Sequence, residues 1–118
     1  MKKILVVEDN DSNYILMTYI LKRGYEFQRA KNGQEAVDMA LTGTFDIVLM
    51  DIKMPVMDGL EATKAIKEKM PELPVVALTA NAFDSDRLLA LEVGCDDFLT
   101  KPISSTKCLE TIEKFIGK

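Results

Sequence analysis

The chain contains no histidine among its 118 residues. This absence excludes Ser-His-Asp and Cys-His catalysis within the chain, and it excludes any metal site that uses a histidine ligand. Only two cysteines are present, Cys95 and Cys108, and they do not form a CxxC pair. We therefore expect both to be reduced core thiols of a cytoplasmic protein.

Long apolar runs are also missing. No run approaches the roughly 20 residues that are needed to cross a bilayer, and Met1-Lys2-Lys3 leads directly into an apolar segment, without the length of a signal peptide. The net charge of −4 argues against a broad nucleic-acid surface. With 47% hydrophobic residues, we expect residues 1–118 to form a single domain with a substantial core, bound to neither membrane nor nucleic acid.

Short apolar runs alternate with segments of helical pattern. Strands are expected near residues 3–7, 27–30, 46–50, 75–78 and 97–100, and helices near 11–23, 34–41, 60–70, 84–93 and after Ser104 or Ser105. This alternation predicts an α/β fold with a five-stranded parallel sheet and helices on both faces. The run at 27–30 contains Gln28 and Arg29 and therefore belongs at an edge, which favours the flavodoxin-like strand order 2-1-3-4-5.

Polar residues follow four of these runs at the point where each expected strand ends. They are Glu8 and Asp9, Asp51, Thr79, and Lys101. In an open parallel sheet, ligands bind beyond the carboxyl ends of the strands. Three carboxylates, a hydroxyl and an ammonium group should therefore meet at one edge of the sheet.

Such a cluster is suited to binding a divalent metal ion and a phosphoryl group. Carboxylates that share a site repel each other, and a divalent cation with a preference for hard oxygen ligands, such as Mg²⁺, relieves this repulsion. Lys101 supplies a positive charge suited to phosphoryl oxygens, and Thr79 supplies a hydroxyl donor. Because an aspartate can act as a nucleophile, Asp51, which stands alone at the end of its strand, is the best candidate.

The whole chain resembles the receiver domain of two-component response regulators. The matching pieces, in order, are Glu8-Asp9, the run Asp51-Ile52-Lys53-Met54-Pro55-Val56-Met57-Asp58-Gly59, Thr79-Ala80 and Lys101-Pro102. No single piece is specific, but the ordered set at matching strand ends is. The segment 78–83 is similar to receivers found in hybrid sensor kinases. The parent protein is therefore either a free-standing regulator or a hybrid histidine kinase.

The resemblance implies a role for each matched residue. Asp51 is expected to accept a phosphoryl group, Lys101 to pair with that group, and Thr79 to act as the switch hydroxyl. The expected magnesium ligands are Glu8, Asp9, Asp51 and the backbone carbonyl of Lys53. Phe98 matches the switch aromatic, which is more often tyrosine in the family, and the Lys101-Pro102 bond is a candidate cis peptide.

The implied partner is a histidine kinase or a histidine phosphotransfer protein, because the chain has no histidine to carry a donor phosphate. The domain would catalyse its own phosphoryl transfer and autodephosphorylation without being a turnover enzyme, and it would be a monomer or weak homodimer. Two other functions stay open here. One is a phosphatase of the haloacid-dehalogenase kind, which would want an acid two residues after Asp51, where Lys53 stands. The other is a receiver without phosphorylation that only binds partners.

The expected helix at 11–23 has almost no polar face. We assign Leu16, Met17 and Ile20 to its core stripe, because they share one side of the helix. Tyr14, Ile15 and Tyr19 fall on the other side. These three residues are either partly buried under neighbouring loops or form a docking surface.

Overall fold

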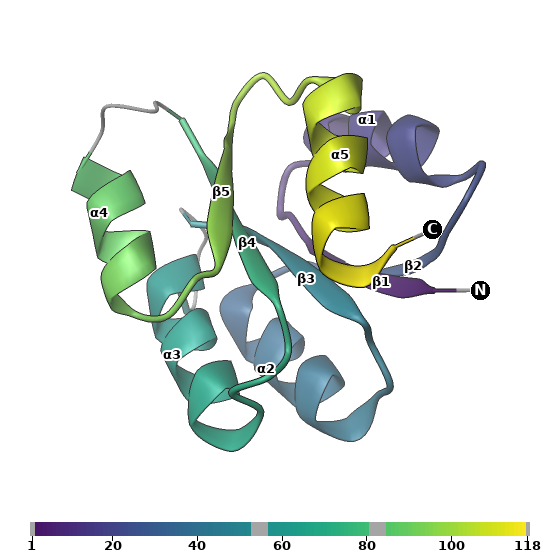
Figure 1. The fold of residues 1–118 in the computed structure, drawn as a ribbon. Coiled ribbons are helices and arrows are strands. Elements are labelled where there is room, and N and C mark those ends of the chain that lie inside the picture. The colour runs from purple at the N-terminus through teal and green to yellow at the C-terminus, as the bar shows by residue number, and fades with distance from the viewer. Residues whose placement is uncertain (1, 53–56, 81–84, 118) are drawn as a thin grey trace.

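The computed structural model describes residues 2–52, 57–80 and 85–117. Strands and helices alternate along the chain (Figure 1). The strands are β1 Lys3–Val7, β2 Glu26–Ala30, β3 Ile47–Asp51, β4 Val75–Thr79 and β5 Asp97–Thr100. The helices are α1 Asp11–Leu21, α2 Gly33–Thr42, α3 Gly59–Lys69, α4 Ser85–Glu92 and α5 Ser105–Ile116. The element order confirms the expected α/β alternation.

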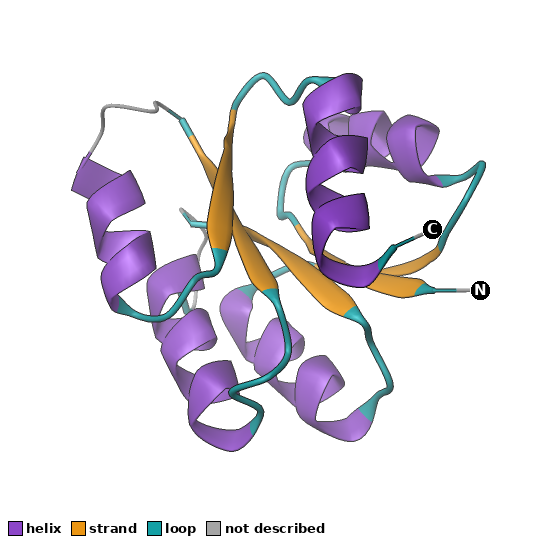
Figure 2. Cartoon of the chain, in the orientation of Figure 1, coloured by secondary structure: helices purple, strands orange, loops and turns teal. Residues whose placement is uncertain are grey.

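The five strands form one parallel sheet in the order β2-β1-β3-β4-β5 (Figure 2). This confirms the predicted strand order, with β2 at an edge. The register pairs Val7 with Met50, Asp51 with Leu78, and Thr79 with Thr100. The carboxyl ends of the strands are therefore aligned at one edge of the sheet.

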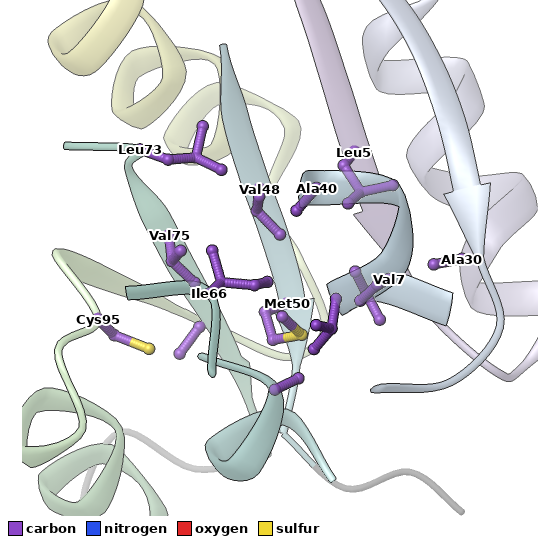
Figure 3. Packing of buried hydrophobic residues seen from close by; sticks show 14 of the residues in the cluster. Leu5, Val7, Ala30, Ala40, Val48, Met50, Ile66, Leu73, Val75 and Cys95 are labelled. Atoms are coloured by element: carbon purple, nitrogen blue, oxygen red, sulfur yellow. The ribbon is translucent and has the colours of Figure 1, made fainter. Parts of the chain in front are cut away.

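The core consists of two apolar layers, one on each face of the sheet. Leu5 and Val7 of β1 belong to the layer that includes residues of α2 and α3 (Figure 3). Ile4 and Val6 belong to the other layer, which includes residues of α1 and α5. This alternation is the period of two that a strand imposes on its side chains. Truncating a fully buried residue such as Leu5 to alanine would cost about 2–5 kcal/mol.

Helix boundaries follow from local capping chemistry. Side-chain oxygens of Asn10, Asn32, Asp58 and Ser104 accept a hydrogen bond from the backbone three residues on, which satisfies a free N–H of the first helical turn. Ser104, rather than Ser105, is therefore the cap of α5. Gly94 ends the turn after α4 with a positive φ of 109°. The suggested cap Asp84 lies outside the described residues.

The buried face of helix α1 differs in part from the one predicted from the sequence. Its buried stripe is Met17, Ile20 and Leu21, so the predicted core position of Leu16 was wrong, because that residue is 42% exposed. Tyr14 is half-buried and its ring makes an edge contact with Phe27 at 6.4 Å between centroids. The exposed apolar surface of α1 thus consists of Ile15, Leu16 and Tyr19, which we call the α1 patch.

Both cysteines are free and buried, as expected. Burial raises the pKa of Cys95 to about 11 and that of Cys108 to about 12, which keeps both thiols protonated near neutral pH. Within the described part of the chain, no helix has the length and apolar character needed to cross a membrane.

Candidate functional site

Three strands bring the predicted charged site residues to the carboxyl edge of the sheet. Glu8 and Asp9 follow β1, Asp51 is the last residue of β3, and Lys101 follows β5. Glu8 and Asp51 are buried, with 1% and 4% of their surface exposed, whereas Asp9 is exposed. The expected end of the third strand was one residue short, because Asp51 still pairs with Leu78 of β4. Its backbone is therefore fixed by the sheet itself.

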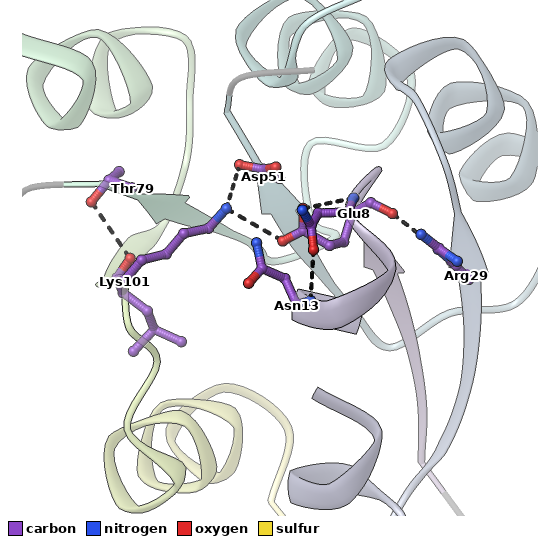
Figure 4. Close-up of polar contacts among 8 residues, drawn as sticks. Glu8, Asn13, Arg29, Asp51, Thr79 and Lys101 are labelled. Atoms are coloured by element: carbon purple, nitrogen blue, oxygen red, sulfur yellow. Dashed lines mark hydrogen bonds and ion pairs between the residues drawn. The ribbon is translucent and has the colours of Figure 1, made fainter. Parts of the chain in front are cut away.

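Lys101 joins the two buried acids (Figure 4). Its Nζ lies 3.1 Å from Asp51 Oδ1 and 3.3 Å from Glu8 Oε1. The Lys101 N–H also donates to the Thr79 carbonyl at 2.7 Å, which anchors the loop after β5 to the end of β4. One cation thus neutralises part of the charge that the fold brings together.

The pKa values of Glu8 and Lys101 reflect the attraction between the ammonium group and the two acids. Burial and, to a smaller extent, the neighbouring Asp51 carboxylate raise the pKa of the Glu8 carboxyl to about 7, although Lys101 opposes the shift. Burial alone would lower the pKa of Lys101, but the Asp51 and Glu8 carboxylates reverse this and hold it above its ordinary value. The site therefore contains more negative charge than one ammonium group balances.

The three acids form a cluster with the geometry of a metal site. One carboxylate oxygen from each of Glu8, Asp9 and Asp51 lies within 4.8 Å of the others. These acids line a cavity of about 240 Å³, together with Lys101 and Asn13 among other residues. Hard oxygen donors beside a cavity that admits water fit a divalent cation such as Mg²⁺.

Thr79 lies at the same edge of the sheet, but its hydroxyl is hydrogen-bonded to β5. It is buried, and its hydroxyl donates to the Leu99 carbonyl of β5 at 3.5 Å. The structure therefore brings Glu8, Asp9, Asp51 and Lys101 together, while the Thr79 hydroxyl is hydrogen-bonded towards β5. Phe98 is partly buried against the core. The Lys101-Pro102 peptide bond is cis, which confirms the candidate cis peptide named from the sequence.

The predicted metal ligand Lys53 lies outside the described residues, so its role stays a prediction. The described residues on either side of positions 53–56 are in close contact with each other. Gly59 at the start of α3 packs so closely that a Cβ there would collide with the Asp51 carbonyl oxygen. Its N–H donates to the Ile52 carbonyl at 2.8 Å.

Sequence reasoning missed two residues at the site. Asn13 of α1 lines the cavity, with its side chain pointing towards Lys101 and Glu8 (Figure 4). Arg29 of β2 donates from Nε to the Glu8 carbonyl at 3.0 Å. The signal for Asn13 was its place on the sheet-facing side of the first helix, whereas Arg29 was interpreted only as a sign of an edge strand.

Comparison with known proteins agrees with this geometry. Residues 4–113 match the family model of the response regulator receiver domain. The chain is 39% identical over 119 residues to the polar-differentiation response regulator DivK of Brucella anthropi, with 98% of this chain and 97% of that protein covered. The relatives of Brucella ovis and Brucella suis show the same identity and coverage.

Two solved structures are close in fold. The receiver domain of sensor histidine kinase PA1611 from Pseudomonas aeruginosa, which holds a magnesium ion in its active-site cleft, is 35% identical with a TM-score of 0.93, covering 99% of this chain and 98% of that one. A chain of the co-crystal structure of a Saccharomyces cerevisiae histidine phosphotransfer signaling protein with the receiver domain of its downstream response regulator is 33% identical with a TM-score of 0.91, covering 98% and 88%.

The chain belongs to the response regulator receiver domain family of two-component signalling. The predicted family resemblance is thereby confirmed. The haloacid-dehalogenase alternative is not favoured, because the fold, the strand order and the relatives all agree on a receiver.

Proposed function

We propose that Asp51 accepts a phosphoryl group from a phosphohistidine on a partner protein, in a reaction that requires Mg²⁺. The observation that carries this proposal is the buried Asp51 carboxylate, which lies 3.1 Å from the Lys101 ammonium and within reach of two further acids. In this step a P–N bond of the donor breaks, a P–O bond to Asp51 forms, and the leaving imidazole keeps the electron pair. Water removes the phosphoryl group in the later autodephosphorylation.

Each residue has a distinct part in the proposed reaction. Glu8, Asp9, Asp51 and the Lys53 carbonyl would hold Mg²⁺, which would supply positive charge to the phosphoryl oxygens. The sheet fixes Asp51 for in-line attack, which matters because phosphoryl transfer depends mainly on positioning and charge stabilisation. Lys101 then exchanges its contact with Asp51 for one with the phosphoryl group.

The switch is proposed to follow from the new charge. An aspartyl phosphate adds about −1.5 to −2 charges by analogy with other phosphoamino acids. The Thr79 hydroxyl, which now donates to the Leu99 carbonyl, turns to a phosphoryl oxygen, and Phe98 moves with it. The face formed by α4, β5 and α5 changes shape as a result.

The proposed partner is a histidine kinase or a histidine phosphotransfer protein. The α1 patch supports this, because Ile15, Leu16 and Tyr19 are 52%, 42% and 63% exposed on the helix that begins beside the site. Such an apolar surface is typical of an interaction site. We expect the exchange in the cytoplasm, where thiols such as Cys95 and Cys108 stay reduced.

The test is phosphorylation by acetyl phosphate with and without Mg²⁺, followed by an intact mass measurement. We expect one added phosphoryl group in the parent only with Mg²⁺, and none in Asp51→Asn. An adduct of the same yield in Asp51→Asn would overturn the assignment. Asp38→Asn, which removes an exposed acid from α2, is the matched control and should be phosphorylated like the parent.

A further inference from the structure

The end of β1 is held by β2, in part through an arginine. The Glu8 N–H donates to the Ala30 carbonyl at 3.0 Å, and Arg29 Nε donates to the Glu8 carbonyl at 3.0 Å. Both main-chain groups of Glu8 are therefore bonded to β2. Because the side chain of Glu8 leaves from this fixed backbone, its approach to Asp51 and Lys101 depends on these bonds.

The same guanidinium also contacts the first turn of α1. Arg29 Nη1 lies 2.9 Å from Asp11 Oδ1, and the guanidinium carbon lies 4.6 Å from the centre of the Tyr14 ring. One side chain thus connects Glu8, at the end of β1, to Asp11, at the start of α1. Asp9 lies between these two anchors and is the exposed acid of the cluster.

Packing alone does not account for an arginine at this position. Its side chain is only 16% exposed, and Nη2 is buried without a hydrogen-bond partner among the described residues. Burying an unpaired N–H costs free energy, and the other side chains packed here, Phe27 and Tyr14, are aromatic. What the guanidinium contributes is a fixed fork of donors that reaches two segments at once.

We propose that Arg29 is a positioning residue for the metal site: it fixes the segment from Glu8 to Asp11 so that the Glu8 and Asp9 carboxylates meet Asp51. This inference rests on the proposed function, in which these three acids hold Mg²⁺. Arg29 itself touches neither the metal nor the phosphoryl group. It acts through the main chain of Glu8 and the side chain of Asp11.

A positioning role and a purely electrostatic role for Arg29 predict opposite effects on Mg²⁺ affinity. Arg29 is a cation near a cationic ligand, so removing its charge should strengthen Mg²⁺ binding if only Coulomb forces matter. If Arg29 orders the two acids, its removal should weaken Mg²⁺ binding despite the lower repulsion. Arg29→Met removes the charge and the donors, while Arg29→Lys keeps the charge but loses the planar fork.

The experiment measures Mg²⁺ affinity by isothermal titration calorimetry at about 0.15 M salt, where exposed charges are screened beyond roughly 8 Å. The Mg²⁺ dependence of phosphorylation by a small phosphodonor is measured alongside. We expect both Arg29 variants to bind Mg²⁺ roughly three- to tenfold more weakly, at or below the low end of the roughly 10- to 100-fold loss typical of residues that orient metal ligands directly. At saturating Mg²⁺ the phosphorylation rate should return to within about twofold of the parent, because positioning is lost but Lys101 and Asp51 are intact.

Lys31→Met is the matched control. Lys31 is exposed and lies directly after β2, so this variant removes one charge from the same end of the strand without breaking the contacts of Arg29. Its Mg²⁺ affinity should be unchanged or slightly higher. If Arg29→Met does not fold, as judged by circular dichroism, Arg29→Lys decides the question.

A folded Arg29→Lys that binds Mg²⁺ like the parent would overturn the proposal, as would a rate that stays several-fold low at saturating Mg²⁺. These failures differ from failure of the proposed function. If the parent shows no Mg²⁺-dependent phosphorylation, or if Asp51→Asn keeps it, the function itself is wrong. If the parent passes and the Arg29 variants match it, only the role of Arg29 is wrong.

Discussion

The Lys101 ammonium lies 3.1 Å from the Asp51 carboxylate, although the two residues are 50 positions apart in the chain. The contact joins the end of β3 to the loop after β5, and Lys101 also pairs with Glu8. In the proposed reaction, Lys101 would supply positive charge at this position both before and after phosphorylation. Its removal should affect stability and reactivity in different ways.

We expect Lys101→Met to leave two buried acids without their cation. In the absence of Mg²⁺ it should be less stable than the parent by about 1–3 kcal/mol, and added Mg²⁺ should recover much of that loss. Phosphorylation at saturating Mg²⁺ should slow by tenfold or more, since a positive group near the transition state is lost. Chemical denaturation and a phosphodonor assay measure the two effects. The exposed Lys107→Met is the control, and equal behaviour of the two variants would contradict this role.

Asp9 and Glu8 should differ as metal ligands. Glu8 is buried and already paired with Lys101, whereas Asp9 is exposed at the mouth of the cluster. We expect Asp9→Asn to weaken Mg²⁺ binding by roughly tenfold or more, because a direct carboxylate ligand is lost. We expect Glu8→Gln to cost less, because Glu8 is already paired with Lys101 and would contact the metal through water. Calorimetric titration compares the two, and equal losses would refute the ranking.

Gly59 should be required for the backbone of the site. A Cβ at this position would collide with the Asp51 carbonyl oxygen, so Gly59→Ala should destabilise the fold by about 1–3 kcal/mol. Gly24 has no heavy atom within 4 Å of a Cβ, and Gly24→Ala should change stability by no more than about 1 kcal/mol. Urea denaturation of both variants gives the comparison. A Gly59→Ala variant as stable as Gly24→Ala would show that the α3 start moves freely.

The α1 patch should matter only for a protein donor. Alanine at Ile15, Leu16 and Tyr19 should slow phosphoryl transfer from a phosphohistidine partner, because an apolar contact surface is lost. Transfer from acetyl phosphate should stay unchanged, since none of the three is a proposed site residue. Leu41→Ala, which truncates a 40% exposed leucine of α2, is the control. If both donors are slowed alike, the patch is not a docking surface.

Much of the fold and site could be predicted because both depend on simple patterns. Apolar runs such as Ile4 to Val7 set the strands, and the alignment of parallel strand ends brings Asp51 and Lys101 together wherever the helices pack. Leu16 was misplaced because a helix that is apolar all round does not reveal which stripe faces the core; the stripe is Met17, Ile20 and Leu21.

Arg29 could not be predicted, because its role exists only in three dimensions. It contacts Glu8 and Asp11, which are 21 and 18 positions away, and nothing in the local sequence marks those contacts. A polar residue in a strand indicates an edge, but the partner of its side chain depends on how α1 crosses the sheet.

The most direct test of the account is to locate the phosphoryl group chemically. After phosphorylation with Mg²⁺, borohydride reduces an acyl phosphate to an alcohol, so the modified aspartate becomes homoserine and is found by tandem mass spectrometry of peptides. We expect homoserine at position 51 alone. Homoserine at position 9 instead, or a phosphoryl adduct with no reducible carboxylate at position 51, would contradict the central claim that Asp51 is the phosphoacceptor.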